Sequence, residues 1–191
     1  SPSLNQSEEV ESLWPVRLAE KTVVTVGRLV PYKGHFGLIE AWRNSRLAEK
    51  GFRLKIIGDG PLSSALQEAI SGQESISILR ACSEAEKKFW LQRACAFVLA
   101  SVDESETFGI AAQEAMAQGL PLVLTDLPTG VKELAREGNC GALARAGDAE
   151  SLSRALQTLL NSPESTLRSI GEANREFVAS RFSPEVLRRE Y

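Results

Sequence analysis

The sequence TVVTVGRLVPYKGHFGLIEAW, residues 22–42, contains the unit that decides the fold. Its first five residues are a short apolar run rich in β-branched side chains, which is typical of a buried strand. A loop with three of the chain's glycines in or just after it follows, and Phe36, Ile39 and Trp42 then recur at a weak helical spacing. The stretch therefore predicts a strand, a loop and a helix in succession.

The same alternation of strand and helix continues along the chain. Further strands are expected at residues 54–57, 76–79, 96–100, 122–124 and 142–144. Apolar residues at helical spacing lie between them, most clearly at 62–70 and 152–160. Such alternation predicts a parallel sheet with helices on both faces. We therefore expect a Rossmann-like, doubly wound α/β domain, whose ligands bind in the loops at the carboxyl ends of the strands.

The length of 191 residues fits one domain with short tails. Residues 1–20 are polar and acidic as far as Trp14 and are expected to be a linker or an excised interdomain segment, which leaves residues 21–191 as the domain. Two final helices are expected to begin at residues 162–164 and 183–185, because each has a serine followed by proline and glutamate. The chain has no starting Met and is interpreted as a piece of a longer protein.

Composition argues against several classes of protein. The net charge of −3 is unlike that of a nucleic-acid-binding domain. No apolar run approaches the roughly 18 residues that span a bilayer, and no signal peptide is visible at the start. The three separated cysteines, Cys82, Cys95 and Cys140, indicate reduced thiols in the cytoplasm rather than a disulfide framework.

Counting residues removes several kinds of catalytic site. His35 is the only histidine, so a two-histidine zinc motif cannot form, and we interpret it as a packing residue. The motif at residues 58–61 begins like a dinucleotide fingerprint but lacks the third glycine. Asp103, Glu104 and Glu106 form an acidic cluster that we interpret as solvated rather than metal-binding. No metal site is expected.

Two loops remain as candidates, and the first joins the opening strand to its helix. Its glycines, among them Gly27, allow close approach of a ligand to the backbone. The helix start offers free N–H groups and the positive end of a dipole. With Arg28 and Lys33 added, the loop would suit a diphosphate. A surface turn with two solvated cations explains the same residues equally well.

The second candidate loop follows the strand expected at residues 96–100. It contains Glu106, and Glu114 follows eight residues later, one turn into the next helix. Carboxylates suit sugar hydroxyls because each can accept two hydrogen bonds. The N–H groups of Gly109 and Ile110 could meet a phosphate. Two exposed acids at a helix start are the alternative, since acids are favoured there in any case.

Taken together, these segments resemble the donor-binding C-terminal domain of GT-B-fold glycosyltransferases, specifically retaining glycosyltransferase family 4. The resemblance covers roughly residues 20–160. Its most specific part is a pair of glutamates, Glu106 and Glu114, followed by Ala115-Met116-Ala117-Gln118-Gly119-Leu120-Pro121. The other matching segments are 26–34, 56–61, 130–133, 137–141 and 147–152.

The resemblance implies a role for each site residue. Arg28 and Lys33 would bind the donor diphosphate and stabilise the leaving nucleoside diphosphate in place of a metal. Glu106 would contact the donor sugar, so these three are the expected catalytic residues. Glu114 would bind the ribose hydroxyls.

The remaining donor-binding residues are also assigned by resemblance. Gly27, Phe108, Gly109 and Ile110 would line the diphosphate and sugar. Arg80, Ala81 and Cys82 would hold the base, mostly through the backbone. No cofactor is implied beyond a UDP- or GDP-linked donor sugar.

The implied reaction is transfer of a sugar to an acceptor hydroxyl with retention of anomeric configuration, in polysaccharide or glycolipid synthesis. A glycan or lipid-linked acceptor would be held by an N-terminal domain outside this sequence, so the chain alone is expected to bind donor without turnover. The full-length enzyme is expected in the cytoplasm or peripherally at the inner face of the membrane.

The sequence departs from the family pattern at two places. Arg80 stands where glycine is usual, and residues 127–130 replace a double-glycine loop. Two other functions remain open: a non-catalytic nucleotide-sugar-binding module, and a GT-B-like epimerase or phosphorylase.

Overall fold

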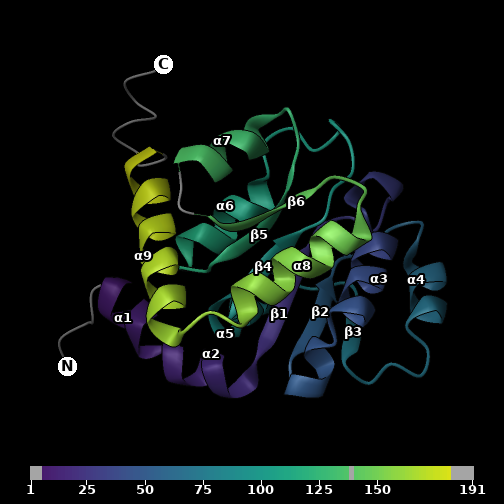
Figure 1. Ribbon diagram of the computed structural model, residues 1–191, viewed down its shortest axis with the longest axis horizontal. Helices are drawn as coiled ribbons and strands as arrows, with labels where there is room; N and C mark the ends of the chain where they lie inside the picture. Colours follow the sequence, from purple (N-terminus) through teal and green to yellow (C-terminus); the bar gives the residue numbers. More distant parts are fainter. Residues whose placement is uncertain (1–5, 138–139, 182–191) are drawn as a thin grey trace.

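A computed structural model describes residues 6–137 and 140–181 of the chain. Its six strands form one parallel sheet in the order β3-β2-β1-β4-β5-β6 (Figure 1). The strands are β1 Thr22–Val26, β2 Arg53–Ile57, β3 Ile76–Leu79, β4 Ala96–Leu99, β5 Leu122–Asp126 and β6 Gly141–Arg145. This is the strand order of a doubly wound Rossmann-like sheet, so the expected fold class is confirmed.

The sheet has a separate hydrophobic cluster on each face. Successive residues of a strand point to opposite faces, and Val23 and Val24 of β1 accordingly belong to different clusters. One face packs against α3 His35–Ser45, α4 Ser63–Ala69 and α8 Ala149–Leu160. The other face packs against α5 Glu84–Arg93, α6 Ile110–Ala117 and α7 Gly130–Glu137. Two short 3-10 helices, η1 Pro31–Lys33 and η2 Leu47–Lys50, precede and follow α3.

The first twenty residues differ from the expected linker. Residues 6–20 contain helices α1 Gln6–Ser12 and α2 Trp14–Glu20, and α2 packs against α5. Trp14 is 2% exposed and belongs to the core. Arg17 is fully buried, and its guanidinium donates to the carbonyl oxygens of Gln92 (2.9 Å), Gln118 (2.7 Å) and Gly119 (3.3 Å). These anchors make residues 6–20 part of the packed domain, which corrects the expectation of a linker.

The last described helix ties the carboxyl-terminal part of the chain to the domain. Helix α9, Glu164–Arg181, begins where the Ser162-Pro163 pair predicted, and it packs beside α6 (Figure 1). The buried Asn174 amide donates to the carbonyl oxygens of Leu120 (2.9 Å) and Cys140 (3.2 Å), which precede the paired strands β5 and β6. The helix expected from Ser183 lies outside the described residues.

The cysteines are free thiols in the described part of the chain. Burial raises the pKa of Cys95 to about 12 and that of Cys140 to about 11, so both stay protonated at neutral pH. None of the helices in the described residues combines the length and apolarity needed to cross a bilayer.

Candidate functional site

The two candidate loops meet at the centre of the sheet. Strand β1 pairs with β2 on one side and with β4 on the other, so the strand order reverses at β1. In doubly wound sheets, ligands bind at such a switch point, beyond the carboxyl ends of the strands. The backbone N–H of Val102, after β4, donates to the carbonyl of Tyr32, after β1, over 2.8 Å. The fold therefore holds the loops after β1 and β4 side by side.

A buried ion pair joins the two loops. Lys33 Nζ lies 2.5 Å from Glu106 Oε2, and the two side chains are only 13% and 8% exposed. The Ser101 hydroxyl donates to the same oxygen over 2.8 Å. The sequence motifs indicated Lys33 and Glu106 individually, and the structure brings them into direct contact.

Arg28 completes the positive side of this site. Its side chain is exposed, and no described residue pairs with the guanidinium. Its backbone carbonyl lies 3.2 Å from Nε2 of His35, which is 3% exposed. Burial lowers the pKa of His35, so the ring is neutral at pH 7. His35 is thus a buried residue that contacts the backbone of the loop, in agreement with its interpretation as a packing residue.

The helices that start at this site have glycine caps. The N-caps of α3 and α6 are Gly34 (φ 69°) and Gly109 (φ 61°), both in the left-handed region. A Cβ on Gly34 would lie 2.0 Å from the carbonyl oxygen of Ala100, so a larger residue is excluded there. By contrast, α5 and α8 are capped by the side chains of Ser83 and Asp148. The first N–H groups of α3 and α6 have no side-chain cap and can meet an anion.

A backbone contact explains the glycine-rich motif after β2. A Cβ on Gly58 would lie 1.8 Å from the carbonyl oxygen of Gly27. The N–H of Leu29 donates to the carbonyl of Asp59 over 2.9 Å, and the N–H of Gly27 donates to that of Ile57 over 3.0 Å. The glycines at 58 and 60 therefore let two backbone turns touch and brace the loop of Arg28.

Glu114 lies in a second polar cluster, between α5 and α6. Its Oε1 accepts a hydrogen bond from Lys87 Nζ over 3.0 Å, and Lys87 also pairs with Glu84 over 2.8 Å. The cluster borders a groove of about 400 Å³ whose lining includes Leu91 and Gln118. No motif pointed to Lys87, since its partner on α6 is 27 residues away along the chain.

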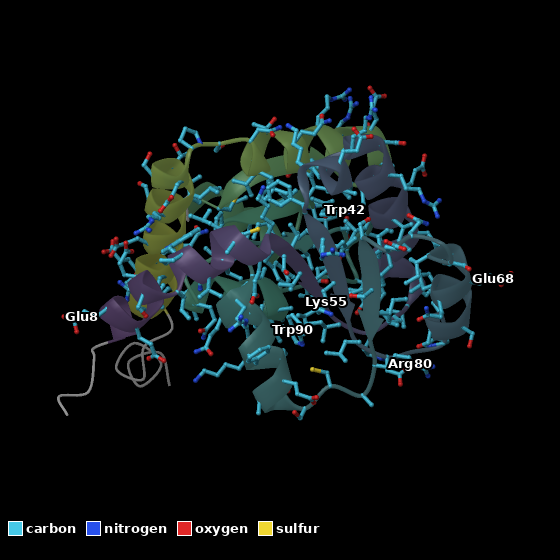
Figure 2. The ribbon with its side chains drawn as sticks, turned by 90° about the horizontal axis from the view of Figure 1, so that it is seen from below. Glu8, Trp42, Lys55, Glu68, Arg80 and Trp90 are labelled. Carbon is cyan, nitrogen blue, oxygen red and sulfur yellow. The ribbon has the colours of Figure 1, made fainter. Side chains whose placement is uncertain are left out.

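The loop after β3 carries the unusual Arg80. Its guanidinium lies 3.2 Å from Asp59 Oδ1 at the outer edge of the molecule, beyond the end of β3 (Figure 2). The Ser63 hydroxyl and the Gly60 N–H hold the pKa of Asp59 below its usual range, with Arg80 adding to this effect. Ala81 has a left-handed φ of 49°, a conformation that costs a non-glycine residue about 1–3 kcal/mol.

The neighbouring Cys82 is half-buried, and burial raises the pKa of its thiol. On the same face of the sheet, Lys55 Nζ of β2 lies 4.1 Å above the ring of Trp90 on α5; both side chains are labelled in Figure 2. Burial lowers the pKa of Lys55. Cys82, Lys55 and Trp90 therefore lie on one face of the sheet, next to the loop that carries Arg80.

The acidic cluster after β4 is dispersed. Asp103 accepts a hydrogen bond from the N–H of Ser105 over 2.8 Å, whereas Glu106 turns inward to Lys33. Within residues 6–137 and 140–181, no three His, Cys, Asp or Glu side chains are grouped to hold a metal ion. Phe108 and Ile110 are 64% and 66% exposed, so their side chains face solvent at the start of α6.

These features define a Rossmann-like domain with cations and two uncapped helix starts at the switch point of its sheet. The chain belongs to the family described as glycosyl transferases group 1, whose model matches residues 8–177.

Curated relatives agree with this family. The chain is 35% identical over 177 residues to an exopolysaccharide phosphotransferase, SCO2592, of Streptomyces coelicolor, covering 91% of this chain and 18% of that protein. It is 30% identical over 175 residues to the putative colanic acid biosynthesis glycosyltransferase WcaL of Salmonella typhimurium, covering 88% and 43%. The chain thus spans less than half the length of either relative.

Solved structures show the same fold. A crystal structure of a mutant of S. aureus TarM, in complex with fondaparinux, alpha-GlcNAc-glycerol and UDP, matches with a TM-score of 0.77 and 20% identity, covering 90% of this chain and 34% of that one. The resemblance to the C-terminal half of a GT-B glycosyltransferase is confirmed by the fold and the family. Retention and membership of family 4 stay predictions.

Proposed function

We propose that this chain is the donor-binding half of a retaining glycosyltransferase that moves a sugar from a nucleoside-diphosphate sugar to an acceptor hydroxyl. The observation that carries the proposal is the buried Lys33–Glu106 pair, 2.5 Å apart, between the uncapped starts of α3 and α6. A diphosphate there would meet Lys33, the exposed Arg28 and two sets of backbone N–H groups.

Each group has a defined task in the proposed transfer. Arg28 and Lys33 offset the negative charge that develops on the leaving diphosphate as the sugar bond breaks. This arrangement needs no metal, because fixed cations and N–H groups supply the positive potential. Glu106 accepts hydrogen bonds from the sugar, and Glu114 accepts them from the ribose. The loop of residues 80–82 lies against the base.

The rest of the reaction belongs to the full-length protein. We propose a glycan or lipid-linked acceptor bound by a further domain, and a setting in polysaccharide or glycolipid synthesis in the cytoplasm or at the inner face of the membrane. The WcaL name, which refers to colanic acid, and the UDP in the TarM crystal support this proposal.

A thermal-shift panel with UDP, GDP, dTDP, ADP and CMP, each with and without EDTA, tests the proposal. A nucleotide at 100 times its dissociation constant adds about 2.7 kcal/mol, or about 5–11 °C for a domain of this size. We expect a clear shift with one base, insensitive to EDTA.

Two double variants then locate the diphosphate. Arg28→Ala with Lys33→Ala should weaken the nucleoside diphosphate far more than the nucleoside. Arg46→Ala with Lys50→Ala removes two cations beside the far end of α3. This control should change the affinity for neither the nucleoside diphosphate nor the nucleoside. Equal losses for nucleoside and nucleoside diphosphate in the first variant would refute the diphosphate role.

A further inference from the structure

Two buried hydroxyl groups connect Glu106 to the carboxyl ends of β4 and β5. The Thr125 hydroxyl, near the end of β5, donates to the carbonyl oxygen of Ser101 over 2.6 Å. The Ser101 hydroxyl, just after β4, donates to Glu106 Oε2 over 2.8 Å. The three residues are 2%, 0% and 6% exposed, so water does not replace these bonds. Side chains at the carboxyl ends of β4 and β5 thus fix the position of one carboxylate oxygen.

The two oxygens of Glu106 are used unequally. Both donors that reach the carboxylate among the described residues, Lys33 Nζ and the Ser101 hydroxyl, bind Oε2. The other oxygen, Oε1, is therefore the one available to a hydroxyl of a bound ligand. Its direction depends on whatever holds Oε2 in place.

Lys33 is a poor permanent holder for this oxygen. Its ammonium group is also the buried cation that would bind the proposed diphosphate, and a bound anion competes with Glu106 for it. Ser101 has no such second task, because its hydroxyl is buried and its own carbonyl is fixed by Thr125. When an anion draws Lys33 away, the bond from Ser101 remains.

We propose that Ser101, supported by Thr125, is a positioning residue that keeps Glu106 aimed at the donor sugar once Lys33 has engaged the diphosphate. The inference rests on the proposed function and adds a specificity role to it. Ser101 acts through Glu106 on the sugar, and it makes no contribution to holding the nucleotide.

Isothermal titration of the chain with UDP, UDP-glucose, GDP and GDP-mannose separates these contributions. In Ser101→Ala, the dissociation constant of the nucleotide should stay within about twofold of the wild-type value. That of the matching nucleotide sugar should rise about tenfold, which corresponds to about 1.4 kcal/mol. Thr125→Val should give the same pattern more weakly, and Thr125→Ser, which keeps the hydroxyl, should restore the wild-type ratio.

Ser45→Ala is the matched control. Ser45 is 3% exposed, and its hydroxyl donates to the carbonyl of Trp42 over 2.7 Å at the far end of α3. Ser45→Ala should lose about as much thermal stability as Ser101→Ala. It should not change the ratio of the dissociation constants for nucleotide sugar and nucleotide.

The possible outcomes are distinguishable. Suppose that the wild-type chain binds a nucleotide sugar. If Ser101→Ala then lowers the affinities for nucleotide and nucleotide sugar equally, or leaves both unchanged, the positioning role is refuted and the proposed function stands. If the wild-type chain binds none of the four probes and no nucleotide of the thermal-shift panel, the proposed function fails and this inference fails with it.

Discussion

Replacement of Arg17 by Met should destabilise the whole domain, although Arg17 lies outside the candidate site. The fully buried guanidinium donates to three carbonyl oxygens at the carboxyl ends of α5 and α6, where a cation also offsets the helix dipoles. Three such bonds at about 1.5 kcal/mol each total about 4.5 kcal/mol. Burial lowers the pKa of Arg17 to about 10, so removing the charge recovers part of this free energy.

We therefore expect Arg17→Met to lower the free energy of unfolding by about 2–4 kcal/mol, which shifts the midpoint by about 4–16 °C. Urea unfolding followed by circular dichroism measures the free energy of unfolding, and a thermal melt measures the midpoint. Arg46→Met, which removes an exposed arginine paired with Glu49, should leave the midpoint nearly unchanged. A loss below about 1 kcal/mol for Arg17→Met would show that burial and hydrogen bonding cancel, and would refute the reasoning.

Glu114→Ala should weaken nucleotide binding by about 1.5–3 kcal/mol in titration calorimetry, because the ribose loses a charged acceptor; Glu84→Ala, which removes the other partner of the same lysine, should not. His35 has a pKa lowered by burial, so the unfolded chain binds more protons just below pH 6.5 and the free energy of unfolding should fall as the pH drops through that range. In urea unfolding at pH 7.5 and 5.5, His35→Gln should remove most of this difference, and an unchanged pH dependence would contradict the assignment. Gly58→Ala should lower the free energy of unfolding by several kcal/mol, because its Cβ would meet a backbone oxygen at 1.8 Å. Gly37→Ala, inside α3 with nothing within 4 Å of the added Cβ, should be neutral or stabilising by up to about 1 kcal/mol. Similar melting temperatures for the two variants would contradict the described backbone contact.

Most of the fold could be predicted because local and global signals agree. The β-branched run of Thr22–Val26 is bounded by glycine and matches β1 residue for residue, and the Ser162-Pro163 pair marks the start of α9. The error at residues 6–20 has a physical origin. Trp14 and Arg17 look like part of a polar segment, since the carbonyls that bury Arg17 lie 75 to 102 residues away in sequence.

The candidate site could be predicted only as separate residues. The switch-point rule and the resemblance both select Arg28, Lys33 and Glu106, but the contact between the last two depends on tertiary structure. Ser101 and Lys87 carried no signal of their own. A serine after a strand and a lysine on a charged helix have many roles, and only the distances to Glu106 and Glu114 distinguish them.

The contact between Gly27 and Gly58 divides the ligand-facing edge into two parts that can evolve at different rates. The turns after β1 and β2 are in backbone contact, so a side chain added to Gly58 would disturb the loop that carries Arg28. The turn after β3 is joined to them by the backbone of β3 and one exposed ion pair, Arg80–Asp59. Arg80 and Ala81 can therefore vary with little effect on Arg28 and Lys33. Under the proposed function, the base-binding loop could change while the diphosphate-binding loop stays the same.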